Sequence, residues 1–186
     1  MEKQKNILEA ALHLLVKNGF DGTPTSKIAA QAGVSNGTLF HYYKTKDELL
    51  IALYNEIKAE MASYLASQSS EPGNLEATFK RTFIHSLYWA LANREKFYYV
   101  QQFHFSPHLA KISPQVVEEQ SRFHLQLITE GIQAKVVKPL PVRLLFTLVS
   151  SHVYGLYQYL LTADAEAQPQ AVIEQGFDLL WNMIKA

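Results

Sequence analysis

The stretch that decides the fold is "IAAQAGVSNGTLFHYY", residues 28–43, in which a turn sequence separates two helical patterns. The first pattern ends at about Ala32. Gly33 then supplies the positive φ that a tight turn needs, and Ser35 stands where it can cap a second helix over residues 36–43. Two short helices joined by such a turn predict a helix-turn-helix motif.

The helix over residues 36–43 has two chemically different sides. On a helical wheel, Leu39 and Tyr43 fall on one side, where they can pack into a core. The other side and its edges carry small, polar or amphipathic residues: Gly37, Thr38, His41 and Tyr42, with Asn36 and Phe40 at the edges. Small residues permit close approach to a DNA major groove, and polar side chains reach base edges and phosphates. For Phe40, burial in the core and a place on the groove wall are both open.

Helix signals also flank this motif. A helical stripe over residues 2–18 ends at Gly19, which suits a C-cap. Thr23-Pro24 fits an N-cap followed by a first helical residue. Thr45 and Glu48 have the spacing of a capping box and open a fourth, longer helix. We therefore interpret Thr45 and Glu48 as caps rather than contacts.

The rest of the chain is dominated by helical periodicity, and alternating strand patterns are scarce. A linker is expected at residues 67–74, where Pro72-Gly73 follows small polar residues. Further helices are expected near residues 74–92, 94–105, 114–136, 140–163 and 169–185. The fold class predicted is all-α.

Composition bounds the possible functions. The 186 residues are 48% hydrophobic and 18% charged, as in a soluble globular protein, and the formal net charge is zero. There is no cysteine, which excludes disulfide scaffolds and thiolate zinc sites. Positive charge is nevertheless concentrated in one segment, because residues 22–46 contain Lys27, Lys44 and Lys46 and no acidic residue.

One segment imitates a membrane span. Leu144 to Ala163 lacks Asp, Glu, Lys and Arg over a length close to that of a bilayer crossing. It also carries polar side chains such as Ser151 and His152, which are costly in hydrocarbon. We expect a buried helix here, no membrane association, and, because no signal-peptide pattern starts the chain, a cytoplasmic protein.

Residues 5–50 resemble the DNA-binding domain of the tetracycline-repressor-like (TetR) family of bacterial transcriptional regulators. The matching run is "ILEAALHLLVKNGFDGTPTSKIAAQAGVSNGTLFHYYKTKDELL", residues 7–50. The resemblance implies an N-terminal three-helix helix-turn-helix domain at residues 1–47. A C-terminal helical domain for ligand binding and dimerisation would follow at residues 48–186.

The resemblance also implies a set of contacts to a double-stranded DNA operator. The recognition helix would use Ser35, Asn36, Gly37, Thr38, Phe40, His41 and Tyr42, the second helix Thr25, Ser26 and Lys27, and the fourth helix Lys46. Two positions depart from the family pattern. Phe40 replaces a frequent tyrosine, and Gln4 replaces a frequent arginine, so phosphate affinity is expected to be modest.

The region after residue 74 is rich in aromatic rings and imidazoles, which suits a partly apolar cavity for a small-molecule inducer. Our candidates for its lining are Trp89, Phe103, His104, His124 and His152. Because few carboxylates lie among the rings, we expect a lipophilic, uncharged or weakly polar ligand. The alternative is a core with hydrogen-bonded histidines. No catalytic motif and no convincing metal-ligand spacing is present, so we expect neither an enzyme, nor a bound metal, nor a cofactor.

Apolar stripes on the last two predicted helices suit either one core or, as in the family, a homodimer interface. The candidate interface residues are Leu148, Val149, Leu156, Ile173, Phe177, Leu180 and Trp181. The function predicted is a ligand-responsive regulator, a repressor that a small lipophilic molecule releases from a palindromic operator. The alternative is a helical small-molecule-binding protein with weak or vestigial DNA binding.

Overall fold

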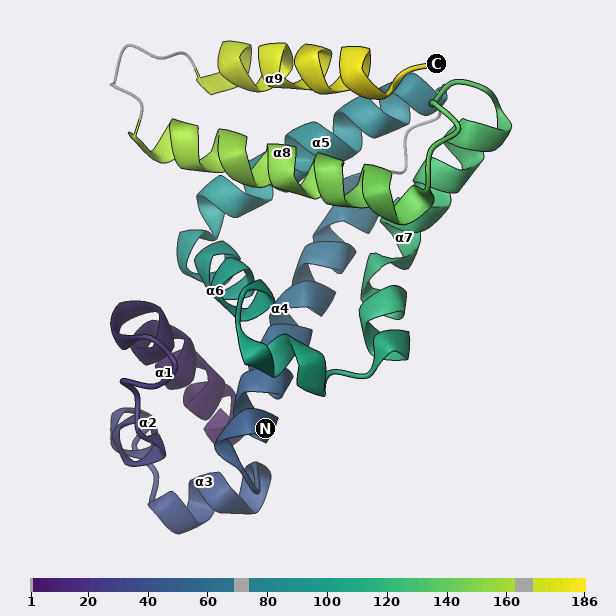
Figure 1. Ribbon diagram of the computed structural model, residues 1–186. Coiled ribbons are helices and arrows are strands. Elements are labelled where there is room, and N and C mark those ends of the chain that lie inside the picture. Colours follow the sequence, from purple (N-terminus) through teal and green to yellow (C-terminus); the bar gives the residue numbers. More distant parts are fainter. Residues whose placement is uncertain (1, 69–73, 163–168) are drawn as a thin grey trace. The chain divides into compact units, whose positions relative to one another are not determined.

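The computed structural model describes residues 2–68, 74–162 and 169–186, and these residues are almost entirely helical (Figure 1). The elements are α1 (Glu2–Asn18), α2 (Thr25–Gln31), α3 (Asn36–Tyr42), α4 (Lys46–Gln68), α5 (Leu75–Ala92), α6 (Arg94–His104), η1 (Pro107–Lys111), α7 (Pro114–Gln133), α8 (Val142–Thr162) and α9 (Pro169–Ile184). Within the described ranges the only β pairing is a single bridge between Val137 and Lys185. The all-α prediction is confirmed.

Most of the predicted helix ends are confirmed by their capping bonds. Gly19 and Gly33 have φ of 75° and 67°, values that favour glycine. The Ser35 hydroxyl accepts the Thr38 N–H at 3.1 Å. Thr45 Oγ1 accepts the Glu48 N–H at 3.1 Å, while the Glu48 carboxylate reaches back to the Lys44 N–H at 2.7 Å.

The N-cap predicted for α2 is wrong. Pro24 is the capping residue, no side chain caps the helix, and α2 begins at Thr25. Thr23 is instead fully buried, and its hydroxyl points back to the end of α1. It lies 2.8 Å from the Gly19 carbonyl oxygen and 3.1 Å from that of Leu14. The residue pattern suited a cap, but burial gives the hydroxyl a different partner.

Helix α7 ends three residues before the predicted end at residue 136. Lys135 has a φ of 60°, a left-handed conformation that terminates helices. The N–H groups of Val136 and Val137 then turn back to the Gly131 carbonyl, at 2.9 and 3.0 Å. This C-terminal turn gives a carbonyl group near the end of the helix its hydrogen-bond donors.

The described residues divide into two compact units, and the first is discontinuous in sequence. It comprises residues 1–60 and 93–116, so α6 and η1 belong with α1, α2, α3 and the first part of α4. Tyr99 on α6 is fully buried there and donates its hydroxyl proton to the Leu50 carbonyl at 2.9 Å. Phe103 stacks on Tyr54 at a ring distance of 4.4 Å, and Phe20 packs edge-on against Tyr99.

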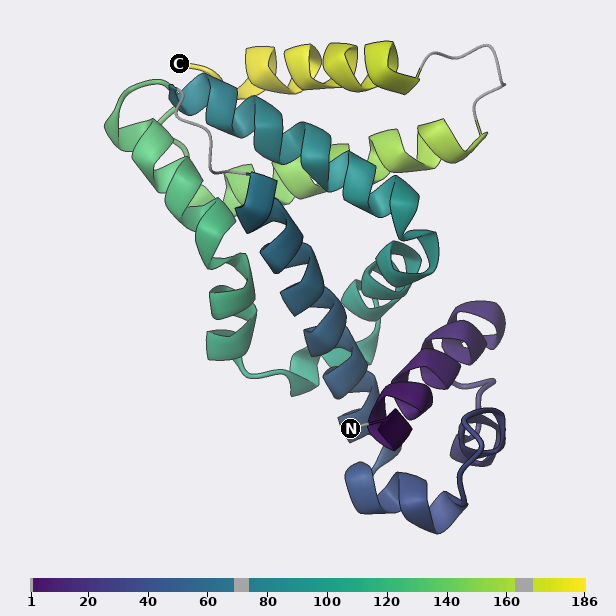
Figure 2. The same ribbon diagram turned by 180° about the vertical axis from the view of Figure 1, so that it is seen from behind.

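The second unit comprises residues 61–92 and 117–186. Helices α5, α8 and α9 pack against one another in it, with α5 behind α8 and α9 in Figure 1 and in front of them in Figure 2. A Cβ on Gly176 would lie 2.4 Å from Leu156 Cδ2, so this glycine permits the close approach of α8 and α9.

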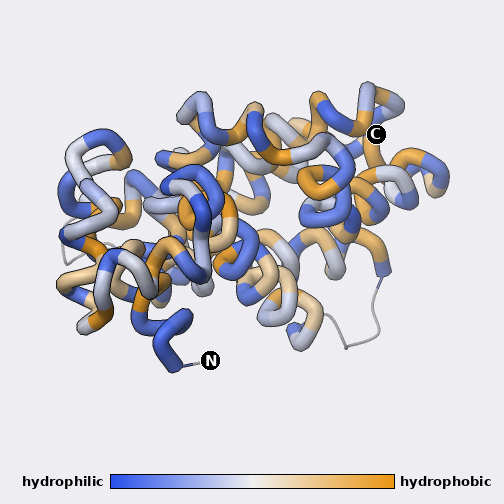
Figure 3. Tube along the Cα trace, turned by 90° about the horizontal axis from the view of Figure 1, so that it is seen from below, coloured by the Kyte–Doolittle hydropathy of each residue, from blue (hydrophilic) through white to orange (hydrophobic). Residues whose placement is uncertain are grey.

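Figure 3 shows hydrophobic and hydrophilic residues alternating along the helical coils, as amphipathic helices require. The segment that imitates a membrane span forms α8, in which Leu145, Val153 and Tyr157 are buried. Among the described helices, none combines the length and the apolar character needed to cross a bilayer.

Candidate nucleic-acid interface

Helix α3 is anchored by one side and exposed on the other. Leu39 is fully buried and Tyr43 is 5% exposed, as the helical wheel predicts. The opposite side is open to solvent: Ser35, Asn36, Gly37, Phe40, His41 and Tyr42 are exposed, and Thr38 is half-buried. Phe40 is 40% exposed, so it belongs to the surface rather than the core. The helix and its capping residue Ser35 therefore present all seven predicted residues on a pre-formed surface.

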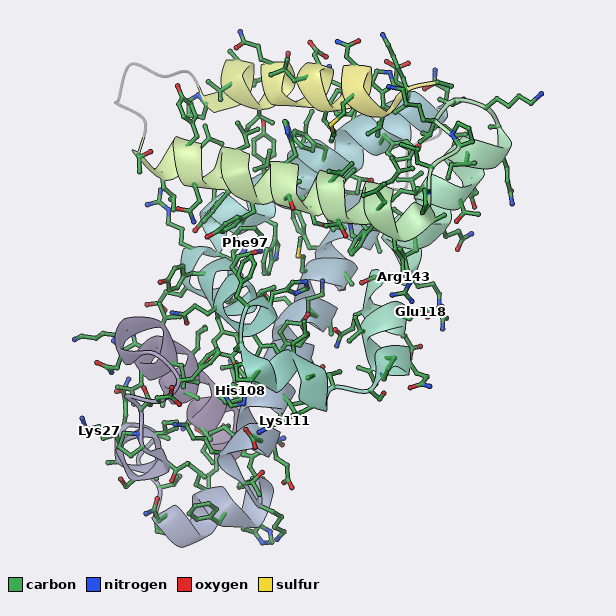
Figure 4. The ribbon with its side chains drawn as sticks, in the orientation of Figure 1. Lys27, Phe97, His108, Lys111, Glu118 and Arg143 are labelled. Atoms are coloured by element: carbon green, nitrogen blue, oxygen red, sulfur yellow. The ribbon has the colours of Figure 1, made fainter. Side chains whose placement is uncertain are left out.

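Helix α2 holds this surface in place and adds polar residues of its own. Ile28 and Ala29 are buried, whereas Ser26 and Lys27 are exposed and Thr25 is half-buried. Figure 4 shows Lys27 projecting outward from α2. The first turn of α2 thus carries two hydroxyls and a cation that are accessible to a binding partner.

Lys46 and Gln4 each have a partner within the first unit. The ammonium of Lys46 donates to the carbonyl oxygen of Phe20. An ammonium has three donors, so two remain for another ligand. The amide of Gln4, where arginine is frequent in the family, donates to the Tyr43 hydroxyl at 3.3 Å. This bond fixes the start of α1 to the end of α3.

The electrostatics near this surface depend on a contact that the sequence did not predict. Asp47, beside Lys46, accepts a hydrogen bond from Lys111 Nζ at 2.6 Å, and its other carboxylate oxygen lies 2.8 Å from His108 Nδ1, at an angle outside that of a hydrogen bond. The hydrogen bond from Lys111 lowers the pKa of Asp47, and His108 contributes to the same shift. Figure 4 places His108 and Lys111 together on η1. The carboxylate that directly follows Lys46 in the sequence is therefore paired with a cation of the first unit.

This Asp47 clamp has no signature in the sequence. Asp47 and Lys111 are separated by 64 positions, and each alone looks like an ordinary surface charge. Only the discontinuous first unit brings them together.

The five candidate ligand-binding residues fall in different units. Phe103 and His104 belong to the first unit, and Trp89, His124 and His152 belong to the second. Phe103 is fully buried, and His152 Nε2 lies 2.9 Å from the Gly176 carbonyl oxygen. Both facts suit the core interpretation of these two residues. The cavity remains a prediction.

The candidate dimer residues divide by burial. Four are buried within the second unit's own core and are not available on the surface of a single chain: Ile173, Phe177, Leu180 and Trp181. Leu148 is 37% exposed, and Val149 and Leu156 are half-buried. Other apolar residues of the same two helices are open to solvent: Leu144, Tyr159, Leu161, Leu179 and Met183.

Two family models together match almost the whole chain. Residues 7–53 match the model of bacterial regulatory proteins of the tetR family. Residues 54–186 match the tetracyclin repressor-like C-terminal domain. The first match covers the helix-turn-helix surface described above.

Individual relatives agree with these matches. The fatty acid metabolism regulator protein of Bacillus subtilis is 43% identical over 54 residues, which are 29% of this chain and 28% of that protein. The chain thus spans less than a third of this curated relative. A TetR-family transcription regulator from Shewanella sp. PV-4 has 30% identity and a TM-score of 0.92, over 99% of this chain and 98% of that one.

A structure of the regulator FadR from Bacillus subtilis, in complex with stearoyl-CoA, shares the fold. Its identity is 22% and its TM-score is 0.79, over 95% of this chain and 96% of that one. The helix-turn-helix, the all-helical second part and both family models lead to one conclusion: this chain belongs to the TetR family of bacterial transcriptional regulators.

Proposed function

We propose that this protein is a transcriptional repressor that binds a near-palindromic operator as a homodimer and is released from it by a small lipophilic ligand. The observation that carries the proposal is the exposed side of α3. Its polar residues have no role in the core, and no acidic residue lies between positions 22 and 46. This is the surface that a major groove accepts.

Gly37 gives specific support to this role. A Cβ at this position would meet only Ser35 Oγ, at 3.7 Å, an ordinary contact. Its φ also lies outside the region that favours glycine. Nothing within the fold therefore requires glycine here, and close approach of a partner supplies the reason.

In the proposed complex, different residues of the surface contact different parts of the DNA. Asn36 and His41 reach base edges, Lys27 and Lys46 contact phosphates, and the exposed ring of Phe40 packs on thymine methyl groups. Because Lys46 already donates to Phe20, a phosphate would occupy its remaining donors.

The dimer is proposed to form through the exposed sides of α8 and α9. Leu144, Leu148 and Tyr159 lie along α8, and Leu179 and Met183 lie along α9, all at least 37% exposed. Gly155 is exposed as well, and a Cβ there would meet no atom within 4 Å, which leaves room for a partner helix. A two-fold dimer places two recognition helices one DNA turn apart, about 34–36 Å.

The protein has one form that binds the operator and one that does not. A ligand releases the operator only if its affinity for the second form is higher than its affinity for the first. Helix α4 begins beside the proposed DNA surface and continues into the second unit. A shift of α4 on ligand binding would change the spacing of the two recognition helices. A lipophilic ligand is supported by the aromatic residues of the chain and by the stearoyl-CoA bound to the FadR relative.

Gly37→Ala provides the test. The substitution should leave the free energy of unfolding unchanged or raise it by up to about 1 kcal/mol, because alanine favours a helix over glycine. It should weaken operator binding, measured by mobility shift on DNA that flanks the gene. Lys17→Ala, on the exposed end of α1, is the control that should leave binding intact.

The wild type must also prefer a fragment of its own locus over random DNA. Lys46→Met should weaken binding to all sequences and reduce the salt slope by about one unit, whereas His41→Ala should change sequence preference. A wild type without such preference would refute the repressor function.

A further inference from the structure

Three lysines of the first unit are partly buried, and two of them have partners. Lys46 donates to the Phe20 carbonyl, and Lys96 binds the Glu60 carboxylate at 2.6 Å. Lys58, on α4, makes no hydrogen bond or ion pair with any described residue. A lysine in this position has lost part of its hydration without a counter-charge, which is unfavourable.

The surroundings of Lys58 do not supply that counter-charge. Burial lowers the pKa of Lys58, and no acidic side chain in the described ranges is close enough to oppose the shift. Two carboxylates of α4 lie two positions from Lys58: Glu60 is already bound by Lys96, and Glu56 is exposed.

Tyr54 lies one helical turn before Lys58, and residues four apart share a face of a helix. Its ring is 2% exposed and stacks on Phe103, and its hydroxyl has no hydrogen-bond partner among the described residues. Burial raises the pKa of Tyr54 to about 12. The phenol therefore keeps its proton and offers a donor, not a negative charge.

His104 completes the group from the neighbouring helix α6. It follows Phe103 directly, and its side chain retains access to solvent. Phe103 stacks on Tyr54 at a ring distance of 4.4 Å, which brings the end of α6 against α4 one turn from Lys58. In agreement with this placement, partial burial lowers the pKa of His104 and the charge of Lys58 lowers it further. Lys58, Tyr54 and His104 thus bring several donors and one ammonium charge together on two adjacent helices, without a carboxylate to pair with Lys58.

We propose that Lys58, Tyr54 and His104 form an anion-binding site, and that the ligand is an amphiphile whose carboxylate or phosphate head group binds there. An ammonium and a phenol are suitable donors for such an anion, and the solvent access of His104 gives the head group a route to the site. The identification of this anion with the inducer rests on the function proposed above. This anionic ligand differs from the uncharged or weakly polar ligand that the sequence predicted. The earlier prediction rested on the composition, which did not reveal that Lys58 lacks a partner.

The test compares ligands that differ only in the head group. Laurate, dodecanol and lauroyl-coenzyme A are titrated against the full-length protein by calorimetry. Laurate or lauroyl-coenzyme A should bind, and dodecanol should bind at least about tenfold more weakly. Binding of laurate assigns the site to a carboxylate, and binding of lauroyl-coenzyme A alone assigns it to a phosphate-bearing head group.

The variants identify the residue responsible. Lys58→Met keeps a flexible apolar side chain, and should lower the affinity for the anion by about ten- to a hundredfold while leaving that for dodecanol unchanged. Lys58→Arg should retain most of the affinity. Lys17→Met, an exposed lysine of the same unit, is the control for loss of charge.

A measurement without ligand checks the same site. Lys58→Met should raise the melting temperature of the unliganded protein, because it removes an unpaired, partly buried charge. A melting temperature below that of the wild type would indicate a structural lysine and overturn the proposal. Equal binding of laurate and dodecanol by the wild type, or binding of none of the three compounds, would also overturn it.

Operator affinity, measured with the same compounds, separates this inference from the proposed function. If dodecanol releases the operator in both wild type and Lys58→Met, the inducible repressor stands and the anion site is refuted. If laurate binds through Lys58 but leaves operator affinity unchanged, the anion site stands and its role in induction is refuted.

Discussion

Replacement of Thr23 by valine tests how the helix-turn-helix is held in place. The Thr23 hydroxyl has one proton, which it shares between the carbonyls of Gly19, at 2.8 Å, and Leu14, at 3.1 Å. Valine keeps the shape of the side chain and removes the donor. The net value of such a bond is about 0.5–1.5 kcal/mol, and an acceptor left unsatisfied in a buried place adds to the loss. We expect Thr23→Val to reduce the free energy of unfolding by about 1–2 kcal/mol.

Urea denaturation followed by circular dichroism measures this change, and Thr23→Asn separates the two possible roles of the residue. At an exposed N-cap, asparagine is at least as good as threonine. At the fully buried position observed here, its larger amide group has no room and no solvent. Thr23→Asn should therefore be more destabilising than Thr23→Val. A Thr23→Val protein within about 0.5 kcal/mol of the wild type, or a stable Thr23→Asn protein, would refute the buried hydrogen bond.

Two further predictions follow from contacts within the first unit, and a third from the exposed residues of α8 and α9. Tyr99→Phe should lower the free energy of unfolding by about 0.5–1.5 kcal/mol, measured in urea, because it removes the bond to a buried carbonyl. The pKa of Asp47 is lower in the folded protein than its ordinary value of 3.8. Asp47 therefore stabilises the folded protein fully above pH 3.8, and this stabilisation is lost as the pH falls through the pKa of the folded state. Lys111→Met should raise that pKa, so acidification below pH 3.8 should lower the melting temperature less than in the wild type. Leu148→Arg combined with Leu179→Arg should give folded monomers in sedimentation.

Each of these predictions has a control. Tyr98, next to Tyr99, is 41% exposed, and Tyr98→Phe should change stability by no more than about 0.5 kcal/mol. An equal loss in both tyrosine variants would contradict the buried bond. If acidification affects Lys111→Met and wild type alike, the Asp47 clamp is not formed in solution. Phe177→Arg places a charge in the core of the second unit and should unfold that unit rather than separate a dimer. A wild type that sediments as a monomer would remove the dimer proposal.

The parts of the fold that could be predicted are those set by neighbouring residues. Ser35, Gly33 and the pair Thr45 and Glu48 act within four positions of their partners, so local pattern suffices. The N-cap role predicted for Thr23 was wrong because the same local pattern fits a capping residue and a buried hydroxyl. Only the packing of the folded chain decides between the two roles. The end of α7 was missed for a similar reason, since the left-handed Lys135 is no glycine.

The parts that could not be predicted depend on distant segments. An amphipathic helix shows that its apolar side is buried, but not against which surface. Ile173 and Phe177 therefore looked like interface residues, yet they pack within their own unit, while Leu179 is 68% exposed. The partner of Asp47 and the lack of a partner for Lys58 are likewise visible only once α6 and η1 lie beside α4.

The discontinuity of the first unit has a consequence for engineered chimaeras. A DNA-reading module cut from this protein at residue 47 would lack residues 93–116, which contribute Tyr99, Phe103 and Lys111 to the same unit. Its Phe20 would lose its aromatic neighbours, and Asp47 would lose its ion pair with Lys111. A graft that changes operator choice while preserving the recipient's effector response must therefore carry two segments of the donor chain, or else exchange only surface residues of α3.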